Sequence, residues 1–142
     1  MFNYKRFCAP RLLMGIGFWL LAFSPLALFA QHGHPLVGTW SGYFNQATSE
    51  PVRVLFTFSF SAEQIISGAF ILNGQRFNYT RAELDPKAWT VTLEAQGKDK
   101  AGNMLTYSLV GKFEKLDSPT DSTLVGVWQE GGTKGDFSIV IN

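Results

Sequence analysis

The sequence predicts an all-β protein of about eight short strands, most simply an antiparallel up-and-down barrel. Three observations support this fold class. Apolar and polar residues alternate in several segments, most strictly over 52–60, and a period of two is that of a half-buried strand. Asn73-Gly74 between two such segments is a two-residue hairpin signal. After residue 30, no window has a helical period.

Residues 1–30 have the composition of a secretory signal peptide, so we expect a signal helix that is not part of the fold. Basic residues, the last of them Arg11, precede an uncharged apolar run over 12–29, and small Ala30 ends it. We expect cleavage after Ala30, which predicts a secreted or periplasmic protein. The alternative is an uncleaved membrane anchor, because about 18 apolar residues can just span a bilayer.

The remaining 112 of the 142 residues, 31–142, suit a single β-barrel domain with one core. They hold 9 of the 12 basic residues and all 11 acidic ones, a net charge of −2. This charge balance disfavours binding to nucleic acids and electrostatic docking to membranes. We therefore expect contact with a membrane only through the leader, if it is not cleaved. The single cysteine, Cys8, falls in the leader, so the domain depends on its core rather than on disulfides.

A Gly-x-Trp motif occurs twice, at 38–40 and at 126–128, each in a strand-like run with the indole on the core face. We expect these two strands, from opposite ends of the domain, to lie side by side and to close the sheet into a barrel. A two-sheet β-sandwich is the alternative, since alternating strands at this spacing fit both folds. The repeated motif favours closure.

The other strands follow from the same alternation and are separated by short polar turns. The expected strands cover 52–60, 65–72, 75–84, 89–96 and 105–113, with a last strand ending in Phe137, Ile139 and Ile141. In these strands the pattern places Phe60 and Trp89 on the inward face. It places Tyr43 and Leu55 on the outward face.

Aromatic residues dominate the predicted inward faces, and this has two interpretations. One is an apolar cavity for a small ligand. The other is a packed core, because a barrel of about eight strands is only just wide enough for its own side chains or for one small ligand. The candidate ligand-binding residues are Trp40, Tyr43, Phe56, Phe58, Trp89, Tyr107 and Trp128.

The domain offers little for catalysis. Its only histidines are His32 and His34 in the N-terminal arm, and it has no cysteine, so a serine nucleophile would lack a base. We therefore predict no enzyme, no catalytic residue, no metal site and no cofactor, and the arm is interpreted as solvated. Arg81 is expected on the outer surface; pointing inward, with Glu83 or Glu94 as its partner, it would indicate a pocket for an anion.

Gly38-x-Trp40 on a first strand resembles the opening of the lipocalin-type and avidin-type (calycin-like) barrels. The pairing of 36–40 with 126–132 also resembles uncharacterised secreted β domains. The resemblance implies a secreted barrel that binds a small ligand at its mouth. The avidin pattern places a polar side chain two residues after the tryptophan, where this chain has Gly42, so biotin binding is not implied.

Two functions are compatible with this sequence. The first is an exported barrel that binds a small apolar or amphipathic ligand at its mouth. It predicts a cavity of at least about 300 Å³, lined by Trp40, Phe56, Phe58, Trp89, Tyr107 or Trp128. The second is an accessory domain with a filled core, whose surface binds a protein or glycan partner. Tyr43, Leu55 and the loops at 45–50 and 115–122 would then carry the contact.

Overall fold

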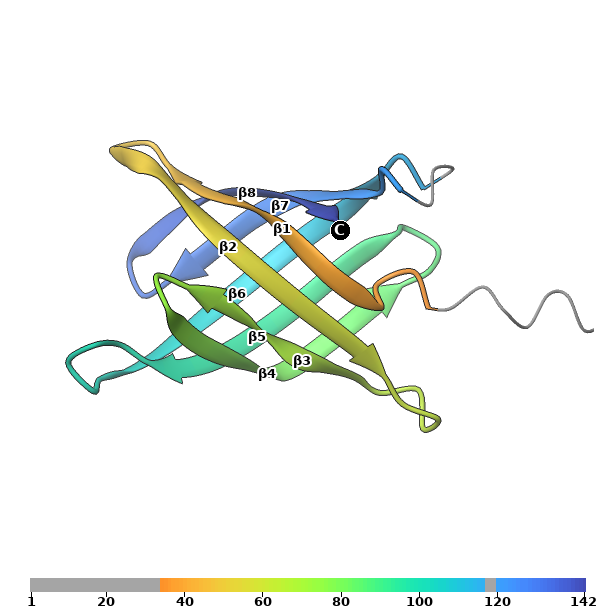
Figure 1. Cartoon of the computed structure of the whole chain (residues 1–142), viewed down its shortest axis with the longest axis horizontal. Helices are drawn as coiled ribbons and strands as arrows, with labels where there is room; N and C mark the ends of the chain where they lie inside the picture. Colours follow the sequence, from red (N-terminus) through yellow and green to blue (C-terminus); the bar gives the residue numbers. More distant parts are fainter. Residues whose placement is uncertain (1–33, 117–119) are drawn as a thin grey trace, which may run out of the picture. The chain divides into compact units, whose positions relative to one another are not determined.

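A computed structural model describes residues 34–116 and 120–142; the predicted leader and His32 lie outside the described residues. The described part is all-β and without a helix, and its eight antiparallel strands close into a barrel (Figure 1). The strands are β1 (Gly38–Gln46), β2 (Ser49–Phe60), β3 (Ile66–Leu72), β4 (Gln75–Asp85), β5 (Thr90–Lys98), β6 (Met104–Glu114), β7 (Thr123–Glu130) and β8 (Thr133–Ile141).

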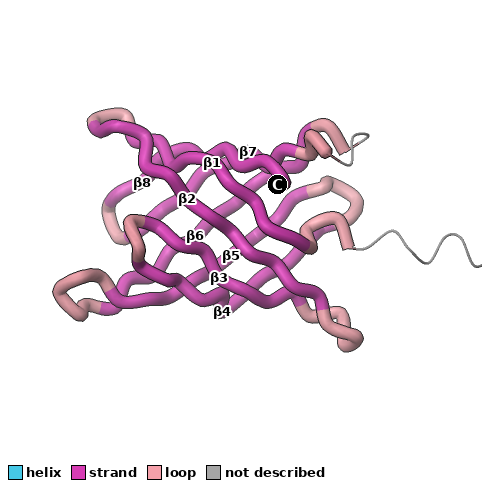
Figure 2. The backbone as a smooth tube through the Cα atoms, viewed as in Figure 1, coloured by secondary structure: helices cyan, strands magenta, loops and turns pink. Residues whose placement is uncertain are grey.

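The barrel has the simplest up-and-down topology, because each strand pairs with the next strand along the chain and β1 pairs with β8 (Figure 2). This closure confirms the barrel over the sandwich. The predicted partner of β1 was wrong, however. The second Gly-x-Trp strand is β7, which pairs with β6 and β8, while β8 places Phe137 opposite Phe44 of β1. The short turn at 131–132 returns the chain at once, so β8 occupies the position beside β1.

The hairpin between β3 and β4 forms where the Asn73-Gly74 signal predicts it. Both residues have positive φ, 51° for Asn73 and 76° for Gly74, as a type I′ turn requires. The turn sets the register, with Leu72 opposite Gln75 and Phe70 opposite Phe77.

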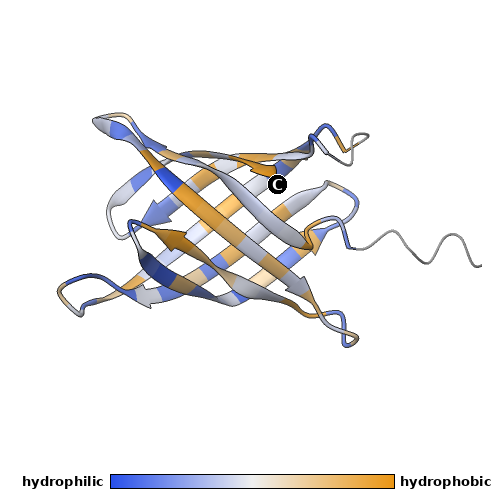
Figure 3. Ribbon diagram, in the orientation of Figure 1, coloured by the Kyte–Doolittle hydropathy of each residue, from blue (hydrophilic) through white to orange (hydrophobic). Residues whose placement is uncertain are grey.

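The interior of the barrel is filled by side chains from the inward faces of all eight strands. Hydrophobic and hydrophilic residues alternate along the strands (Figure 3), and Trp40 and Trp128 are both buried, as predicted. The Phe44 ring lies at the centre of an aromatic cluster. Its ring centroid is within 6.2 Å of those of five other rings: Phe56, Phe70, Tyr107, Trp128 and Phe137.

A glycine on the inward face of β1 allows β8 to pack closely against it. Trp40 and Phe44 point inward, so Gly42 between them does as well. A Cβ atom at Gly42 would overlap the backbone oxygen of Ser138 and would lie 2.8 Å from the Cα of Ile139. The seam between the first and last strands therefore depends on the missing side chain.

Phe60 and Trp89, predicted to point into the core, are instead 40% and 39% exposed. Phe60 occupies the last pair of β2, and β5 begins at Thr90, one residue after Trp89. The alternation is correct in phase, but both residues lie at the end of the barrel, where their rings are only partly covered. This corrects the inward placement of Trp89, a candidate ligand-binding residue.

Candidate functional site

The two ends of the barrel are built differently. One end, here the arm end, carries the N-terminal arm 34–37 and the turns at 61–65 and 86–89 (Figure 1). Leu36 of the arm is fully buried, and the indole Nε1 of Trp40 donates a hydrogen bond of 2.8 Å to its carbonyl oxygen. The arm therefore closes this end and satisfies the polar atom of the buried Trp40.

The other end, here the hairpin end, carries the turns at 47–48, 73–74, 99–103 and 131–132 (Figure 1). Two pockets open there, of about 530 Å³ and about 200 Å³. They share Leu72, Asn73 and Tyr107. The apolar side chains beneath them are Phe44, Val52, Leu72, Phe77, Leu105, Tyr107 and Trp128. The hairpin end thus exposes the top of the aromatic core.

Tyr107 is the polar group at the base of these two pockets. Its ring packs edge-on against Phe70 and Phe77, at centroid distances of 5.3 and 4.8 Å. The residue is almost buried, but its hydroxyl makes no hydrogen bond among the described residues and reaches solvent in the pocket. Burial, and secondarily the charge of Glu130, raise the pKa of Tyr107, so the phenol remains a protonated donor at neutral pH.

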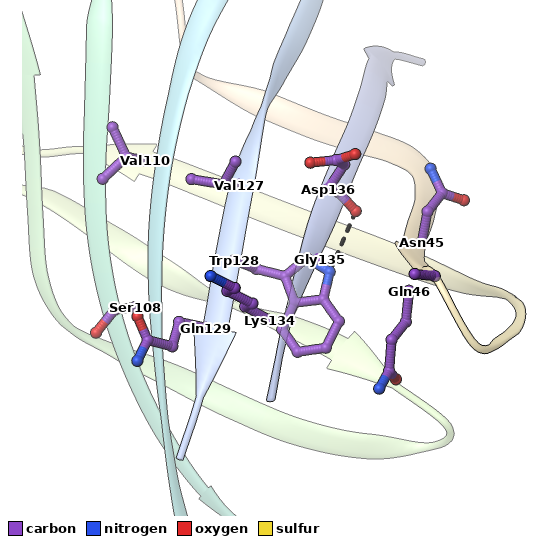
Figure 4. A pocket seen from close by; sticks show the side chains of 11 residues that line it. Asn45, Gln46, Ser108, Val110, Val127, Trp128, Gln129, Lys134, Gly135 and Asp136 are labelled. Carbon is purple, nitrogen blue, oxygen red and sulfur yellow. Dashed lines mark hydrogen bonds between the residues drawn. The ribbon is translucent and has the colours of Figure 1, made fainter. Parts of the chain in front are cut away.

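Trp128 forms the other side of the smaller pocket. Its ring stacks on Phe44 at 5.2 Å, and its Nε1 donates a hydrogen bond of 3.1 Å to the backbone oxygen of Asp136 (Figure 4). A Cβ atom at Gly135 would lie 3.0 Å from this nitrogen. Because the indole is held on two sides, it forms a rigid wall for the pocket.

Trp128 also borders a third pocket, of about 700 Å³, on the outer face of the barrel (Figure 4). Outward-facing residues of β6, β7 and β8 line this pocket, and they alternate along each strand with the buried residues. They include Val110, Val127 and Lys134. The side chains of Asn45 and Gln46 border it from the end of β1 (Figure 4). The apolar part of this pocket rests on the paired valines Val110 and Val127, both exposed, and on Trp128, its one aromatic lining residue.

The seven predicted ligand-binding residues do not form one site. Only Tyr107 and Trp128 line a common pocket, at the hairpin end. Trp89 lines a pocket at the arm end, and Tyr43 lines a pocket of about 420 Å³ on the outer face. The structure buries the other three in the interior: Trp40, Phe56 and Phe58.

The prediction omitted the polar rim of the hairpin-end pockets. This rim includes Asn73, Asp99 and Glu130. Each of these residues is in or beside a turn. Alternate turns of an up-and-down barrel meet at the same end. Their position near turns is therefore the one sequence signal that could have indicated them. The side chain of Asp99 already accepts the backbone N–H of Asn103 at 2.9 Å, and this bond lowers the pKa of Asp99.

Arg81 lies on the outer surface, as expected. Its guanidinium donates two hydrogen bonds, of 2.9 and 3.0 Å, to the carboxylate of Glu83, and it lies 3.6 Å from the carboxylate of Glu94. All three side chains are exposed to solvent, so this cluster is a surface ion pair and not a buried anion site. The outward direction of Arg81 excludes the anion pocket that an inward guanidinium would have formed.

Two further features are absent from residues 34–116 and 120–142. No three His, Cys, Asp or Glu side chains gather there into a group that could hold a metal ion. Nor does a helix in these ranges have the length and apolar character needed to cross a membrane.

Comparison of the whole chain with protein-family profiles, with curated proteins and with solved structures found no match. Function is therefore inferred from the geometry of the barrel itself.

Proposed function

We propose that this protein is an exported barrel that binds a small amphipathic molecule at the hairpin end. The apolar part of the ligand would lie on Phe44, Phe77 and Trp128, and its polar group would accept a hydrogen bond from Tyr107. The observation that carries the proposal is the Tyr107 hydroxyl, a donor without a protein partner among the described residues, at the base of two adjoining apolar pockets. A few placed polar groups in an apolar pocket are typical of small-molecule sites.

The filled interior limits where this ligand can bind. The rings around Phe44 occupy the middle of the barrel, so the ligand would lie on top of the core and not inside it. Asp99 and Glu130 contribute two carboxylates to the rim, against one amine from Lys100. An uncharged polar group would therefore be preferred to a carboxylate.

The larger pocket on the outer face supports the alternative, a surface that binds a partner protein. It is built on exposed valines and flanked by Lys134 and Asp136. We favour the hairpin end because it combines several aromatic rings with a hydroxyl donor that has no protein partner among the described residues, whereas Trp128 is the one aromatic residue that lines the outer pocket.

Binding at the hairpin end is tested with 1-octanol as the probe, in a titration followed by the backbone amide signals in NMR spectra. We expect the largest shifts at Leu72, Asn73 and Tyr107. Tyr107→Phe keeps the ring and removes the donor, which should weaken binding by about three- to tenfold, the value of one hydrogen bond. Decanoate should bind more weakly than 1-decanol.

Tyr43→Phe is the matched control, since it removes the same hydroxyl from a side chain on the outer face. It should leave the affinity for 1-octanol unchanged. Shifts confined to Val110, Val127 and their neighbours would place the site in the outer pocket. Equal affinities of the Tyr107→Phe variant and the unmodified protein would rule out the role given to Tyr107.

A further inference from the structure

A separate pocket of about 580 Å³ opens at the arm end, and it shares no residue with the pockets of the hairpin end. It is surrounded by three aromatic side chains, two prolines, three aliphatic side chains and two polar ones. These are His34, Pro35, Phe60, Gln64, Ile66, Ala82, Glu83, Leu84, Pro86 and Trp89. Because Leu36 closes the interior below, the pocket is a surface site in its own right.

The backbone of Trp89 is in the left-handed region, with φ of 54°. Glycine and asparagine adopt this conformation readily, whereas a bulky side chain is disfavoured there. The turn itself is stabilised by other groups. Asp85 Oδ1 accepts the N–H of Lys87 at 2.9 Å, and the backbone oxygen of Trp89 accepts the N–H of Phe113 at 3.0 Å. The fold thus requires a residue with left-handed backbone conformation at position 89, but it does not require an indole side chain there.

The indole is also largely uncovered. Its side chain is 39% exposed, and its one ring contact among the described residues is an edge-on contact to Phe113 at 6.2 Å. Gln64 in the same pocket has a φ of 62° as well. Two of the four non-glycine residues with positive φ in the described chain therefore border one pocket. Such clustering of disfavoured backbone is a feature of binding sites.

The opposite side of the pocket is formed by a ring pair that carries no net charge. Phe60 stacks on His34 with centroids 4.3 Å apart. The Nδ1 of His34 accepts the backbone N–H of Leu36 at 3.3 Å, and burial lowers the pKa of this histidine. The imidazole is therefore neutral at pH 7, with its proton on Nε2, where it can serve as a donor.

The polar groups of the pocket are suited to hydroxyls and not to ions. Glu83 is the one acidic residue that borders the pocket, but its carboxylate lies on the outer surface, where it accepts two hydrogen bonds from Arg81. The Gln64 amide can both donate and accept hydrogen bonds, and the Nε2–H of His34 can donate one. A ligand of this pocket must therefore present a flat apolar face to the rings, carry hydroxyls around its edge and have no charge.

We propose that the arm-end pocket binds one neutral sugar ring, with the carbon–hydrogen face of the sugar on Trp89 and its hydroxyls on Gln64 and His34. A sugar ring combines both properties, since its axial hydrogens form an apolar face and its hydroxyls lie around the edge. A purely aromatic ligand would leave the Gln64 amide and the His34 donor without a role. The site is independent of the proposed function at the hairpin end.

The test is an NMR titration with the neutral methyl glycosides of glucose, galactose, mannose and N-acetylglucosamine, each at millimolar concentration. With at least one of them, we expect shifts of the Trp89 indole N–H and of the Gln64 side-chain amide. Trp89→Gly should weaken that binding by about tenfold or more. The same variant should leave the urea midpoint of unfolding unchanged or raise it, because glycine adopts the left-handed conformation without strain.

Tyr43→Ala is the control, because it removes an exposed aromatic ring from the outer face without touching this pocket. It should leave sugar binding unchanged. Failure of all four glycosides to shift the Trp89 and Gln64 signals would overturn the proposal, as would tighter binding of indole or phenol than of any glycoside. A marked fall in the urea midpoint of Trp89→Gly would assign the indole to packing on Phe113, which is also contrary to the proposal.

Discussion

Replacement of Trp40 by alanine is expected to lower the free energy of unfolding by about 3–5 kcal/mol, the usual cost of truncating a large buried aromatic residue. Trp40 is fully buried and packs edge-on against Phe113 at 5.9 Å. Its removal also leaves the carbonyl oxygen of the buried Leu36 without its hydrogen bond. Because domains of this size have a total stability of about 5–15 kcal/mol, the variant would be close to unfolding at room temperature.

The measurement is urea unfolding followed by circular dichroism. Tyr43→Ala is the matched control, since Tyr43 lies three residues along the same strand but is 52% exposed, and its loss should cost less than about 1 kcal/mol. Trp40→Phe keeps one aromatic ring but removes the N–H donor and part of the buried ring volume, which should cost about 1–3 kcal/mol. Similar losses for Trp40→Ala and Tyr43→Ala would show that the closed end of the barrel does not depend on Trp40.

Gly42→Ala is expected to cost about 3 kcal/mol or more, the upper part of the range for overpacking. The added methyl group would meet the backbone of β8 at Ser138 and Ile139, and a strand held on both sides cannot move away as a flexible side chain can. The seam between β1 and β8 would have to separate locally. We therefore expect a lower melting temperature together with loss of amide protection on both strands.

Gly132→Ala provides the comparison for this prediction. An added Cβ atom at Gly132 would have no atom within 4 Å, and φ at this residue is not in the left-handed region. Its effect on unfolding should stay within about 0.5 kcal/mol. Equal melting temperatures for the two alanine variants would mean that β8 can shift to accept a side chain, contrary to the close packing described above.

Local sequence pattern predicted most of the fold because a barrel of consecutive hairpins is built from local rules. Alternation identified the inward residues of β2, β5 and β6, and Asn73-Gly74 fixed one turn. The partner of β1 could not be predicted in the same way. Backbone hydrogen bonds do not depend on side-chain identity, and both β7 and β8 present an apolar inward face. Only the short turn at 131–132 decides between them.

The candidate site was less predictable because residue type does not show how far along the barrel a side chain lies. Phe58 and Phe60 have the same type and the same phase on β2, yet one is buried and the other is 40% exposed. Tyr107 and Trp128 were identified as aromatic residues. Their position at the hairpin end follows from the register, as do the turn residues around them.

The pairing of β1 with β8 has a consequence for the order of folding. Each of the other seven ladders joins strands that are consecutive in the sequence, whereas the hydrogen bond from Ser41 Oγ to Asn142 Oδ1 joins residues 101 positions apart. Closing so long a loop costs chain entropy before any contact compensates for it. The hairpins should therefore gain hydrogen-exchange protection first and the β1–β8 ladder last. Pulse labelling during refolding would contradict this order if amides of β1 and β8 were protected together with those of β5 and β6.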